Sequence, residues 1–382
     1  MRPIVALAGG GIAGLATAIV LQKQGFEVRV YEAAPAIRGG GGGLLLAVNA
    51  LKALRKMGIE APVLAAGRPV PVFKVLDEFG HIINDMEDDV LMRTFGMTNL
   101  AISRAALHQA LMGQTEGIAI EVNKQVAGFQ QSFNNVQVEF ADGTSVVADY
   151  LIGADGLRSA VRQHVLPNSP PRFAGYTCWR AVIQNRDGVE VPFGFEALGR
   201  SGRCGMVALA DQSVYWFAVV KAEPNDETMK RAGVQDVLAR FQHYTEPIPS
   251  IIRQTQEHEL IWADISDLAP IPHYAFGRVL LIGDAAHATT PNMAQGACQA
   301  LEDAAVLLDL IEKHGNDLTQ VFPRFEQRRL ERTHFIVKAS RTMGRIAQAQ
   351  HPALIALRDT VFRLIPQQAS LNQLRKIYTV DF

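Results

Sequence analysis

The chain has 382 residues, a formal net charge of −1, 48% hydrophobic residues and 20% charged residues. This length suggests two domains or one large body with an insertion, and the balanced charge excludes a general electrostatic attraction to nucleic acid. The three cysteines, Cys178, Cys204 and Cys298, lie far apart, which argues against a disulfide framework or a zinc ribbon and is typical of a reducing compartment.

The N-terminal residues predict a strand, a glycine-rich turn, a helix and a second strand, at Ile4–Ala8, Gly9–Gly14, Leu15–Gln24 and Glu27–Tyr31. Gly9, Gly11 and Gly14 have the G-x-G-x-x-G spacing that permits a tight turn, close approach of a pyrophosphate and close helix packing. Glu32 ends the second strand, where an acid accepts hydrogen bonds from the ribose of an adenine dinucleotide and disfavours a 2′-phosphate. FAD or NAD is therefore expected here, and the alternative is a glycine-rich turn beside an ordinary surface acid.

The remaining pattern alternates between elements of a nucleotide-binding α/β domain and β-rich segments. Residues 70–100 are irregular, and the other predicted elements are helices at Asn49–Met57 and Ser103–Met112, a hairpin of Val136–Phe140 and Ser145–Ile152, strands at Thr177–Ile183, Gly205–Ala210 and Val214–Val220, a helix at Gln235–Gln242, a strand at Arg278–Ile282, and helices from Gln295 to Lys313 and over Gln320–Met343. We predict an α/β fold with a discontinuous nucleotide-binding domain (1–70, 101–172 and 273–343), an inserted β-rich substrate domain (71–100 and 173–272) and a C-terminal helical segment (344–382).

One stretch, Pro3–Gln22, carries no charge and resembles a signal peptide or a membrane span in composition. Its glycines fall at the fingerprint spacing, and Glu32 follows where the ribose acid is expected. We therefore predict a buried strand and its packed helix inside a soluble, cytoplasmic protein without stable membrane insertion.

Two further motifs carry a family resemblance. Ile152–Arg162 includes Gly153–Gly156 (G-A-D-G), and Gly283–His287 (G-D-A-A-H) leads through Pro291–Gly296 to Glu302-Asp303. Together with the N-terminal fingerprint, these segments span nearly the whole chain and resemble the class A, 4-hydroxybenzoate hydroxylase-like FAD-dependent monooxygenases, which are single-component aromatic hydroxylases. The resemblance implies a Rossmann-like FAD-binding domain of the glutathione reductase type with an inserted β-sheet substrate domain.

The resemblance also implies roles for single residues. Asp284 would hold the flavin ribityl chain, and Asp155 would lie near the pyrophosphate. The helix that begins near Gln295 would point its positive end at the flavin pyrimidine, and Pro291 would line the active face of the flavin. The predicted cofactor-binding residues are Gly9, Gly11, Ala13, Gly14, Glu32, Arg104, Asp155, Asp284, Gly296 and Ala297.

Two departures from the family pattern concern the surroundings of the flavin. Five consecutive glycines, Gly39–Gly43, predict either a floppy linker or a mobile segment beside the isoalloxazine. Ala294 stands where glycine is commoner in the family, so the local backbone geometry is in question.

The inserted sheet would form the roof of the substrate pocket. In the urate hydroxylase branch of the family, an arginine and a tyrosine at positions resembling Arg203 and Tyr215 meet the substrate. These two residues and Pro291 are therefore the predicted catalytic set, and a sheet-edge cation is the alternative for Arg203. Tyr176–Arg180 resembles in part a segment of bacterial alkylquinolone 3-monooxygenases, which favours a bicyclic or N-heteroaromatic substrate.

The strand around Tyr215 has two different faces. Tyr215, Phe217 and Val219 alternate with Trp216 and Ala218. Because strand side chains alternate with period two, only one of these sets can meet the flavin.

The predicted activity is the hydroxylation of an aromatic or N-heteroaromatic small molecule by O₂, with NADPH or NADH as reductant. The resemblance implies a flavin C4a-hydroperoxide as the oxidant, and a single dinucleotide fingerprint implies that the nicotinamide binds transiently. The alternatives are a flavin oxidase that does not use NAD(P)H and a catalytically idle FAD-binding partner protein. We expect no metal and no nucleic acid as partner, and a monomer or a homodimer.

The C-terminal residues are basic. Residues 320–382 carry eleven Lys or Arg and four Asp or Glu, and Ala353–Ile365 is amphipathic. A solvated helical face is the expected explanation, and weak peripheral contact with a membrane is the alternative.

Overall fold

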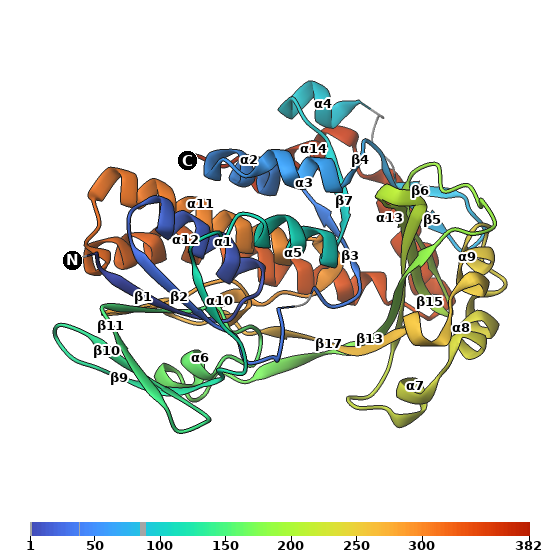
Figure 1. The fold of residues 1–382 in the computed structure, drawn as a ribbon. Coiled ribbons are helices and arrows are strands. Elements are labelled where there is room, and N and C mark those ends of the chain that lie inside the picture. Colours follow the sequence, from blue (N-terminus) through green and yellow to red (C-terminus); the bar gives the residue numbers. More distant parts are fainter. Residues whose placement is uncertain (1, 38, 85–88) are drawn as a thin grey trace.

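The computed structural model describes residues 2–37, 39–84 and 89–382. Its first sheet has six strands in the order β18-β19-β12-β1-β2-β8 (Figure 1). These strands are β1 (Ile4–Ala8), β2 (Glu27–Tyr31), β8 (Ala119–Glu121), β12 (Tyr150–Gly153), β18 (Ala275–Phe276) and β19 (Val279–Leu281). β1 pairs in parallel with β2 and β12, and β12 pairs in parallel with β19. Three segments that are far apart in the sequence therefore meet as parallel neighbours in one sheet, which β18 extends by pairing antiparallel to β19.

Helices cover one face of this sheet, and a small antiparallel sheet lies on its other side (Figure 1). The helices are α1 (Ile12–Lys23), α11 (Gly296–His314) and α12 (Leu318–Ala347), with α2 (Val48–Met57), α3 (Glu60–Ala66) and α5 (Arg104–Met112) beside them. The small sheet consists of β9 (Val126–Gln131), β10 (Val136–Phe140) and β11 (Ser145–Ala148), and α6 (Ala160–Val165) packs against β9.

The uncharged N-terminal stretch is explained by burial. Every residue of α1 from Ile12 to Leu21 is buried, and α1 packs against both β2 and α11. A charge at any of these positions would lose its hydration without gaining a partner. Within the described ranges, no helix is both long and apolar enough to cross a membrane.

The second large sheet has seven strands in the order β17-β13-β16-β15-β14-β5-β6. Its strands are β5 (Phe73–Asp77), β6 (Ile82–Asn84), β13 (Pro171–Gln184), β14 (Gly194–Gly199), β15 (Gly202–Ala208), β16 (Ser213–Lys221) and β17 (Ile261–Leu268). One face buries Trp179 and Trp216 in a core shared with α8 (Val234–Phe241) and α9 (Ile248–Gln254), and α7 (Glu227–Arg231) lies at one end. The other face looks toward the first sheet and is free to line a site.

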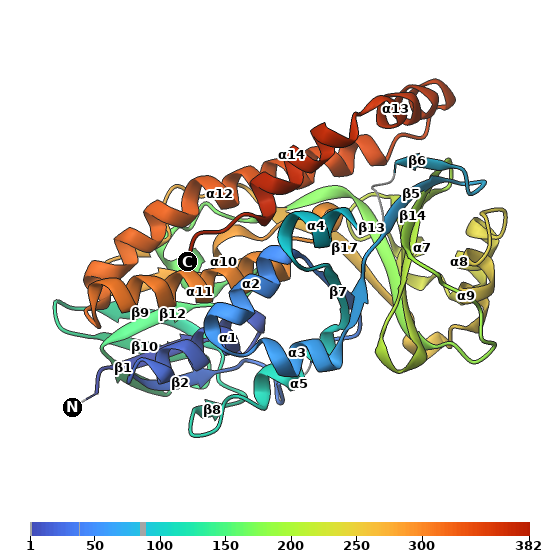
Figure 2. The same cartoon turned by 90° about the horizontal axis from the view of Figure 1, so that it is seen from above.

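A third, three-stranded sheet lies between the two large ones. It consists of β3 (Gly43–Leu46), β7 (Asn99–Ser103) and β4 (Arg68–Val70), in that order. Three helices complete the fold on this side: α4 (Val90–Phe95), α13 (Pro352–Leu364) and α14 (Gln367–Tyr378). Figure 2 shows α14 running back toward the first sheet, with α13 at the outer edge of the molecule beside β6.

The structure differs from the sequence predictions in detail. The predicted strand Ser145–Ile152 is two strands in different sheets, because Asp149 interrupts it and its carboxylate accepts a hydrogen bond from the Ile4 backbone N–H at 2.7 Å. α1 begins at Ile12, before Gly14 rather than after it. Part of the segment 70–100 that looked irregular forms β5, β6 and α4.

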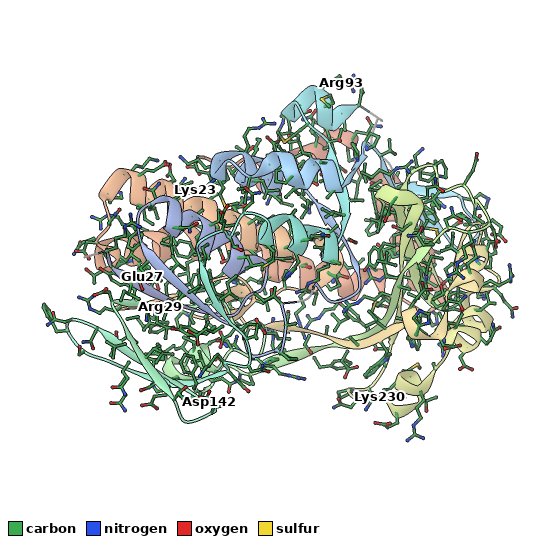
Figure 3. All side chains as sticks on the ribbon, in the orientation of Figure 1. Lys23, Glu27, Arg29, Arg93, Asp142 and Lys230 are labelled. Atoms are coloured by element: carbon green, nitrogen blue, oxygen red, sulfur yellow. The ribbon has the colours of Figure 1, made fainter. Side chains whose placement is uncertain are left out.

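Charged side chains of both signs are spread over the molecular surface (Figure 3). Figure 3 labels Glu27 and Arg29 on β2, Asp142 beyond β10, Lys230 on α7 and Arg93 on α4. This distribution agrees with the small net charge.

Candidate functional site

The glycine-rich turn brings α1 very close to the end of β1. A Cβ atom on Gly14 would lie 1.9 Å from the carbonyl oxygen of Gly9, so no larger residue fits without moving the helix. Gly9 has φ of +101°, and a Cβ there would lie 2.5 Å from the Ala154 carbonyl oxygen. A Cβ on Gly11 would meet no atom within 4 Å. The turn is therefore tight toward the protein and open at Gly11, where unpaired N–H groups of the helix N-terminus can bind an anion.

Glu32 lies beside this turn at the end of β2. Its Oε2 accepts a hydrogen bond from the Gly10 N–H at 2.7 Å, and its Oε1 accepts one from the Ala34 N–H at 2.8 Å. Each oxygen of an ionised carboxylate has a second lone pair, so these bonds leave room for hydroxyl donors. The carboxylate thus also holds the turn in shape, a role that sequence spacing did not reveal.

Asp155 follows β12 and faces the same turn. Its Oδ2 accepts hydrogen bonds from the backbone N–H groups of Ala160 at 2.7 Å and Val161 at 3.2 Å, at the start of α6. Its Oδ1 is buried and has no partner among the described residues. Burial is the largest influence on this carboxyl and raises its pKa. An unpaired buried oxygen at this point suits a donor from a bound ligand.

Asp284 lies at the start of α10 (Asp284–His287) with an exposed side chain. Gly283 before it has φ of +56°, and a Cβ there would lie 2.7 Å from the Cβ of Ala13. The Gly283 N–H donates to Oδ2 of the buried Asp303 at 2.8 Å. This close contact holds Asp284 next to the first turn of α1.

A cavity of about 560 Å³ joins these motifs to the seven-stranded sheet. Its lining includes Gly11, Ala13, Arg104, Gly156 and Asp284, then Pro291, Gly296 and Ala297 of the segment that leads into α11, and the inner face of β15 and β16. It also includes the apolar side chains of Phe73, Val90, Leu91, Leu374 and Tyr378. The cavity therefore combines a polar turn with apolar side chains of α4 and α14.

The N-terminus of α11 points into the middle of this cavity. Pro291 begins a short 3₁₀ turn, and Ala294 ends it with φ of +52°, in the left-handed region where glycine is commoner. Gly296 and Ala297 then open a helix of 19 residues with its positive dipole end at the cavity. Such a helix end stabilises negative charge on a ring lying against it.

Arg203 and Tyr215 lie on the cavity wall opposite this helix. Arg203 is 3% exposed; its Nη1 is 3.0 Å from Glu196 Oε1, and its Nη2 donates to Asn292 Oδ1 at 2.7 Å. Its Nε has no partner among the described atoms. Burial raises the pKa of the Tyr215 hydroxyl, so that this group stays protonated at physiological pH.

The two faces of β16 divide as the alternation predicts. Tyr215, Phe217 and Val219 line the cavity, whereas Trp216 and Ala218 are buried in the core on the far side. Period-two alternation predicted that only one set could face the site, and the structure shows that this is the Tyr215 set.

Comparison with known proteins identifies the family. Residues 3–316 match the family model described as "FAD binding domain". Among curated relatives, the aurachin C monooxygenase/isomerase of Stigmatella aurantiaca is 34% identical over 94% of both chains, and the 2-heptyl-3-hydroxy-4(1H)-quinolone synthase of Pseudomonas aeruginosa is 33% identical over 98% of this chain and 97% of its own. The chain belongs to this FAD-binding family of monooxygenases.

Solved structures of related enzymes agree with this result. The structure of Klebsiella pneumoniae HpxO with FAD and uric acid superposes with a TM-score of 0.88 and 25% identity, over 98% of this chain and 96% of that one. A salicylate hydroxylase substrate complex superposes with a TM-score of 0.81 over the full chain and shares the fold at 22% identity. The predicted α/β fold with an inserted sheet and a helical C-terminal segment is confirmed. The prediction of an FAD-dependent monooxygenase is also confirmed, and it is favoured over the two alternatives, a flavin oxidase and an idle FAD-binding partner protein.

The monooxygenase fold places every predicted cofactor residue around one cavity or the turn beside it. Gly11, Ala13, Arg104, Asp284, Gly296 and Ala297 line the cavity itself, and Gly9, Gly14, Glu32 and Asp155 shape its polar end. The open cradle at Gly11 and the unpaired Oδ1 of Asp155 fit a dinucleotide. The residues present therefore suit FAD.

The sequence did not predict a buried ionic cluster behind α11, the helix whose N-terminus points into the cavity. Arg329 of α12 contacts Glu302, and its Nε donates to Asp303 Oδ1 at 2.7 Å; all three side chains are at most 1% exposed. Glu302 also contacts Arg332 and accepts from Asn49 Nδ2 at 3.0 Å, and Asp303 contacts His287 Nε2 at 2.8 Å. The guanidinium of Arg329 helps to hold the pKa of both carboxyls below the usual range against the effect of burial.

Several lining residues were not among the predicted catalytic or cofactor-binding residues. Arg180 lies on the cavity wall, beside Gly42, with an Nε that has no partner among the described residues. Leu374 and Tyr378 come from the last helix, and no local signal ties that helix to a site formed more than 70 residues earlier in the chain. Period-two alternation places Arg180 on the same face of β13 as Cys178, which also lines the cavity, so Arg180 could have been found.

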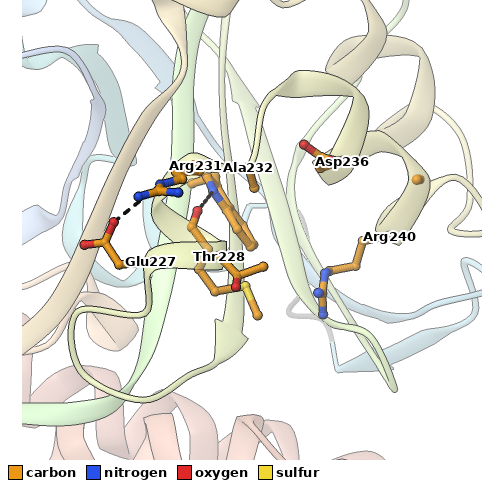
Figure 4. Close-up of a pocket in the computed structure, with 9 residues that line it drawn as sticks. Glu227, Thr228, Arg231, Ala232, Asp236 and Arg240 are labelled. Carbon is orange, nitrogen blue, oxygen red and sulfur yellow. Dashed lines mark hydrogen bonds and ion pairs between the residues drawn. The ribbon is translucent and has the colours of Figure 1, made fainter.

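A second hollow, of about 710 Å³, lies on the opposite face of the seven-stranded sheet, between α7 and α8 (Figure 4). Its wall includes the Glu227–Arg231 pair, and Trp179 Nε1 donates to the Met229 carbonyl oxygen at 3.0 Å. Because Trp179 and Trp216 fill the layer between this hollow and the cavity, the hollow is separate from the flavin site.

Proposed function

We propose that this FAD-dependent monooxygenase hydroxylates a carbon of a fused N-heteroaromatic ring of the 4-quinolone class that carries an apolar tail. The observation that carries this proposal is the lining of the cavity, which joins the predicted cofactor residues to apolar side chains of α4 and α14. The names of two relatives that match this chain over nearly its full length refer to aurachin C and to a 2-heptyl-3-hydroxy-4(1H)-quinolone. The second name describes a 4-quinolone ring with a seven-carbon tail.

We assign the cofactor residues as follows. Gly9, Gly11 and Gly14 with the start of α1 would hold the pyrophosphate, and Glu32 would accept from the ribose hydroxyls. Asp284 would accept from the ribityl chain, while Asp155 and Arg104 flank the phosphates. Ala13, Gly296 and Ala297 would lie against the flavin. When bound, FAD supplies the activation of O₂, and the side chains bind, orient and keep out water.

The substrate ring would lie between Pro291 and the inner face of β15 and β16. Tyr215 is protonated and can donate a hydrogen bond to a ring oxygen. Arg203 holds Asn292 beside Pro291 and has one unpaired N–H, and Arg180 is a second cation on the same wall. Cations here would bind a ring oxygen and so orient the neighbouring electron-rich carbon that receives the oxygen atom.

We further propose the division of the chain into an FAD-binding part (1–70, 101–172 and 273–343), a substrate part (71–100 and 173–272) and a C-terminal helical segment (344–382). O₂ is the proposed oxygen source, and NADPH or NADH, typical of this family, is the reductant. The three unpaired cysteines suit a reducing compartment, so we assign the enzyme to the cytoplasm, as a monomer or homodimer.

A series of substrates tests the proposed tail site. Purified enzyme with FAD is given 2-alkyl-4(1H)-quinolones with tails from methyl to nonyl, and NAD(P)H oxidation is measured together with product mass. We expect an oxygen-added product and a kcat/KM that rises about fourfold for each added CH₂ until the pocket is filled, since each buried CH₂ contributes about 0.8 kcal/mol.

Leu374→Phe narrows the apolar end of the cavity, and Leu371→Phe, on the same helix outside the cavity, is the matched control. The first variant is expected to lose activity with long tails but to keep it with 2-methylquinolone, whereas the control keeps the wild-type profile. If quinolones fail to stimulate NAD(P)H oxidation, or tail length has no effect on kcat/KM, the proposed substrate class is wrong.

A further inference from the structure

One row of residues crosses the inner face of the seven-stranded sheet from a cation to an anion. Arg180 of β13 lies opposite Phe217 of β16. Gly205 of β15 lies opposite both Phe217 and Glu196 of β14. Arg180 and Glu196 are therefore three strand spacings apart, or about 14 Å between Cα atoms. Both side chains line the cavity, so it carries opposite charges on two sides of one row.

The space between the two charges is covered by an aromatic ring. A Cβ atom on Gly205 would lie 2.4 Å from Cζ of Phe217, so the Phe217 ring extends over this glycine toward Glu196. The Tyr215 ring lies beside it, with ring centroids 5.9 Å apart. A planar aromatic ligand packs well on such a surface. A ring held there has one edge toward the cation and the other toward the anion.

The carboxylate of Glu196 has a single partner in the part of the chain that the structure describes. Its Oε1 lies 3.0 Å from Nη1 of Arg203, and no other described group forms a hydrogen bond or ion pair with it. The side chain is 18% exposed and lines the cavity. A carboxylate can accept about four hydrogen bonds, so most of this capacity is unused.

The guanidinium of Arg180, across the row, is also unpaired. Its Nε is buried without a hydrogen-bond partner, and no described residue forms an ion pair with it. A guanidinium offers five N–H donors. The two sides of the row therefore hold a set of free donors and a set of free acceptor positions, both open to a ligand in the cavity.

A bound ligand has to satisfy this carboxylate. A substrate that fills the cavity displaces the water next to Glu196, and a carboxylate that loses water without gaining a donor is strongly destabilised. The contact with Arg203 occupies one side of the carboxylate only. A tightly bound ring should therefore present a hydrogen-bond donor to Glu196 and an acceptor to Arg180.

We propose that Glu196 determines substrate specificity by accepting a hydrogen bond from the ring N–H of a 4(1H)-quinolone, while Arg180 donates to the ring carbonyl oxygen. In this ring the N–H and the carbonyl oxygen lie on opposite sides, as the two charges do. The inference rests on the proposed function and narrows its substrate class to rings that keep the N–H. A ring with oxygen in place of the N–H would leave the carboxylate without a donor.

The test compares two ligands that differ at this one atom. Binding of 2-heptyl-4(1H)-quinolone and of 2-heptylchromone, which has a ring oxygen in place of the N–H, is measured by titration of flavin fluorescence in the FAD-loaded enzyme without NAD(P)H. We expect the wild type to bind the quinolone at least about 100-fold more tightly, because a site built around a substrate N–H discriminates strongly against an analogue that lacks it.

Glu196→Gln removes the charge but keeps the size of the side chain. The amide oxygen can still accept from Arg203, which leaves the amide NH₂, a donor, for the ligand. The preference for the quinolone should fall below about tenfold, mainly through weaker quinolone binding. Glu78→Gln is the matched control, because Glu78 follows β5 of the same sheet, lies 3.6 Å from Arg200 and does not line the cavity. It should keep the wild-type preference.

Arg180→Met tests the other side of the row. Both ligands carry the ring carbonyl, so this variant should weaken the binding of both by about tenfold and leave the ratio of their dissociation constants unchanged. Flavin absorbance and Tm are measured for every variant, and values equal to those of the wild type show that the variant is folded and holds FAD.

Two results would overturn the inference: equal binding of quinolone and chromone by the wild type, which requires no variant, or an undiminished preference in Glu196→Gln. Wild-type binding of both ligands by Arg180→Met would overturn the role of Arg180. An oxygen-added quinolone product without the N–H preference would leave the proposed function in place and refute this inference. The preference without any oxygen-added product would support the inference and refute the proposed reaction.

Discussion

Arg329→Met is the sharpest test of how α11 is held in place. The change removes a buried cation from between Glu302 and Asp303 and leaves an unbranched apolar side chain in its place. Glu302 keeps its contact with Arg332, and Asp303 keeps His287, but both carboxylates lose a charge-assisted partner inside the protein. Breaking a buried ion pair by removing one partner costs about 3–5 kcal/mol.

This cost is expected to depend on pH. In the wild type the pKa of both carboxyls is lowered, so their contribution to stability is present above their unfolded pKa of about 4 and is lost as the pH falls. In the variant, burial without the guanidinium raises both pKa values. As the pH falls, protonation of these carboxylates removes the cost of burying their unpaired charge in the variant. The difference in free energy of unfolding between variant and wild type is therefore largest at neutral pH and becomes smaller toward pH 5.

The assay is thermal unfolding followed by circular dichroism between pH 5 and pH 8. If the whole chain unfolds as one unit, the change corresponds to a decrease in Tm of about 4–6 °C at neutral pH, and to more if the FAD-binding part unfolds alone. Arg324→Met, an exposed position on the same helix, is the control. A Tm equal to that of the control, or a deficit that does not change with pH, would refute the assigned role of the ionic cluster.

Three further predictions concern the turn, the flavin helix and the thiols. Gly14→Ala should abolish FAD retention, because the added Cβ would lie 1.9 Å from the Gly9 carbonyl oxygen. Retention is measured by flavin absorbance after gel filtration. A yellow protein with the same ratio of FAD to protein as the wild type would contradict this prediction. Ala294 has φ of +52°, a left-handed conformation that strains a residue with a Cβ atom. Ala294→Gly should therefore leave the free energy of unfolding in urea unchanged or raise it by about 1 kcal/mol. A decrease in this free energy, as is typical of Ala→Gly elsewhere, would show that the strain is absent. Burial raises the pKa of all three thiols, to about 11 for Cys178, to about 12 for Cys298, and also for Cys204. These thiols should therefore react with a disulfide reagent at pH 8 only after the protein unfolds. A fast reaction of one thiol in the folded protein would show that this thiol is accessible.

The parts of the fold that the sequence predicted well have local causes. The turn at Gly9–Gly14 is fixed by contacts within a few residues, and Ser103 caps α5 by accepting from the Ala106 N–H at 3.1 Å. The order of strands in the first sheet depends instead on pairing between β1 and β12, which lie more than 140 residues apart. Only the family resemblance, and not periodicity, could join these segments.

The residues of the candidate site also differ in how far the sequence could predict them. Glu32, Asp155 and Asp284 sit at strand ends with recognisable neighbours, so motif spacing located them. Arg203 was predicted as a substrate contact, but its pairing with Glu196 and Asn292 involves three separate elements and could not be foreseen. Residues 353–365 were expected to be a solvated amphipathic face; their pattern was correct, but α13 presents the apolar side to solvent.

The contribution of α14 to the cavity bears on the order in which the protein can mature during synthesis. β1, β2 and α1 leave the ribosome before β12, but β19 supplies the pairing partner of β12 only after more than 120 further residues have been made. Leu374 and Tyr378 follow later still, and Arg332 then binds the carbonyl oxygens of Lys376 and Ile377. The nascent chain therefore exposes an incomplete, apolar-walled cavity until α14 has been made, and a chain that stopped before α14 would leave that wall open.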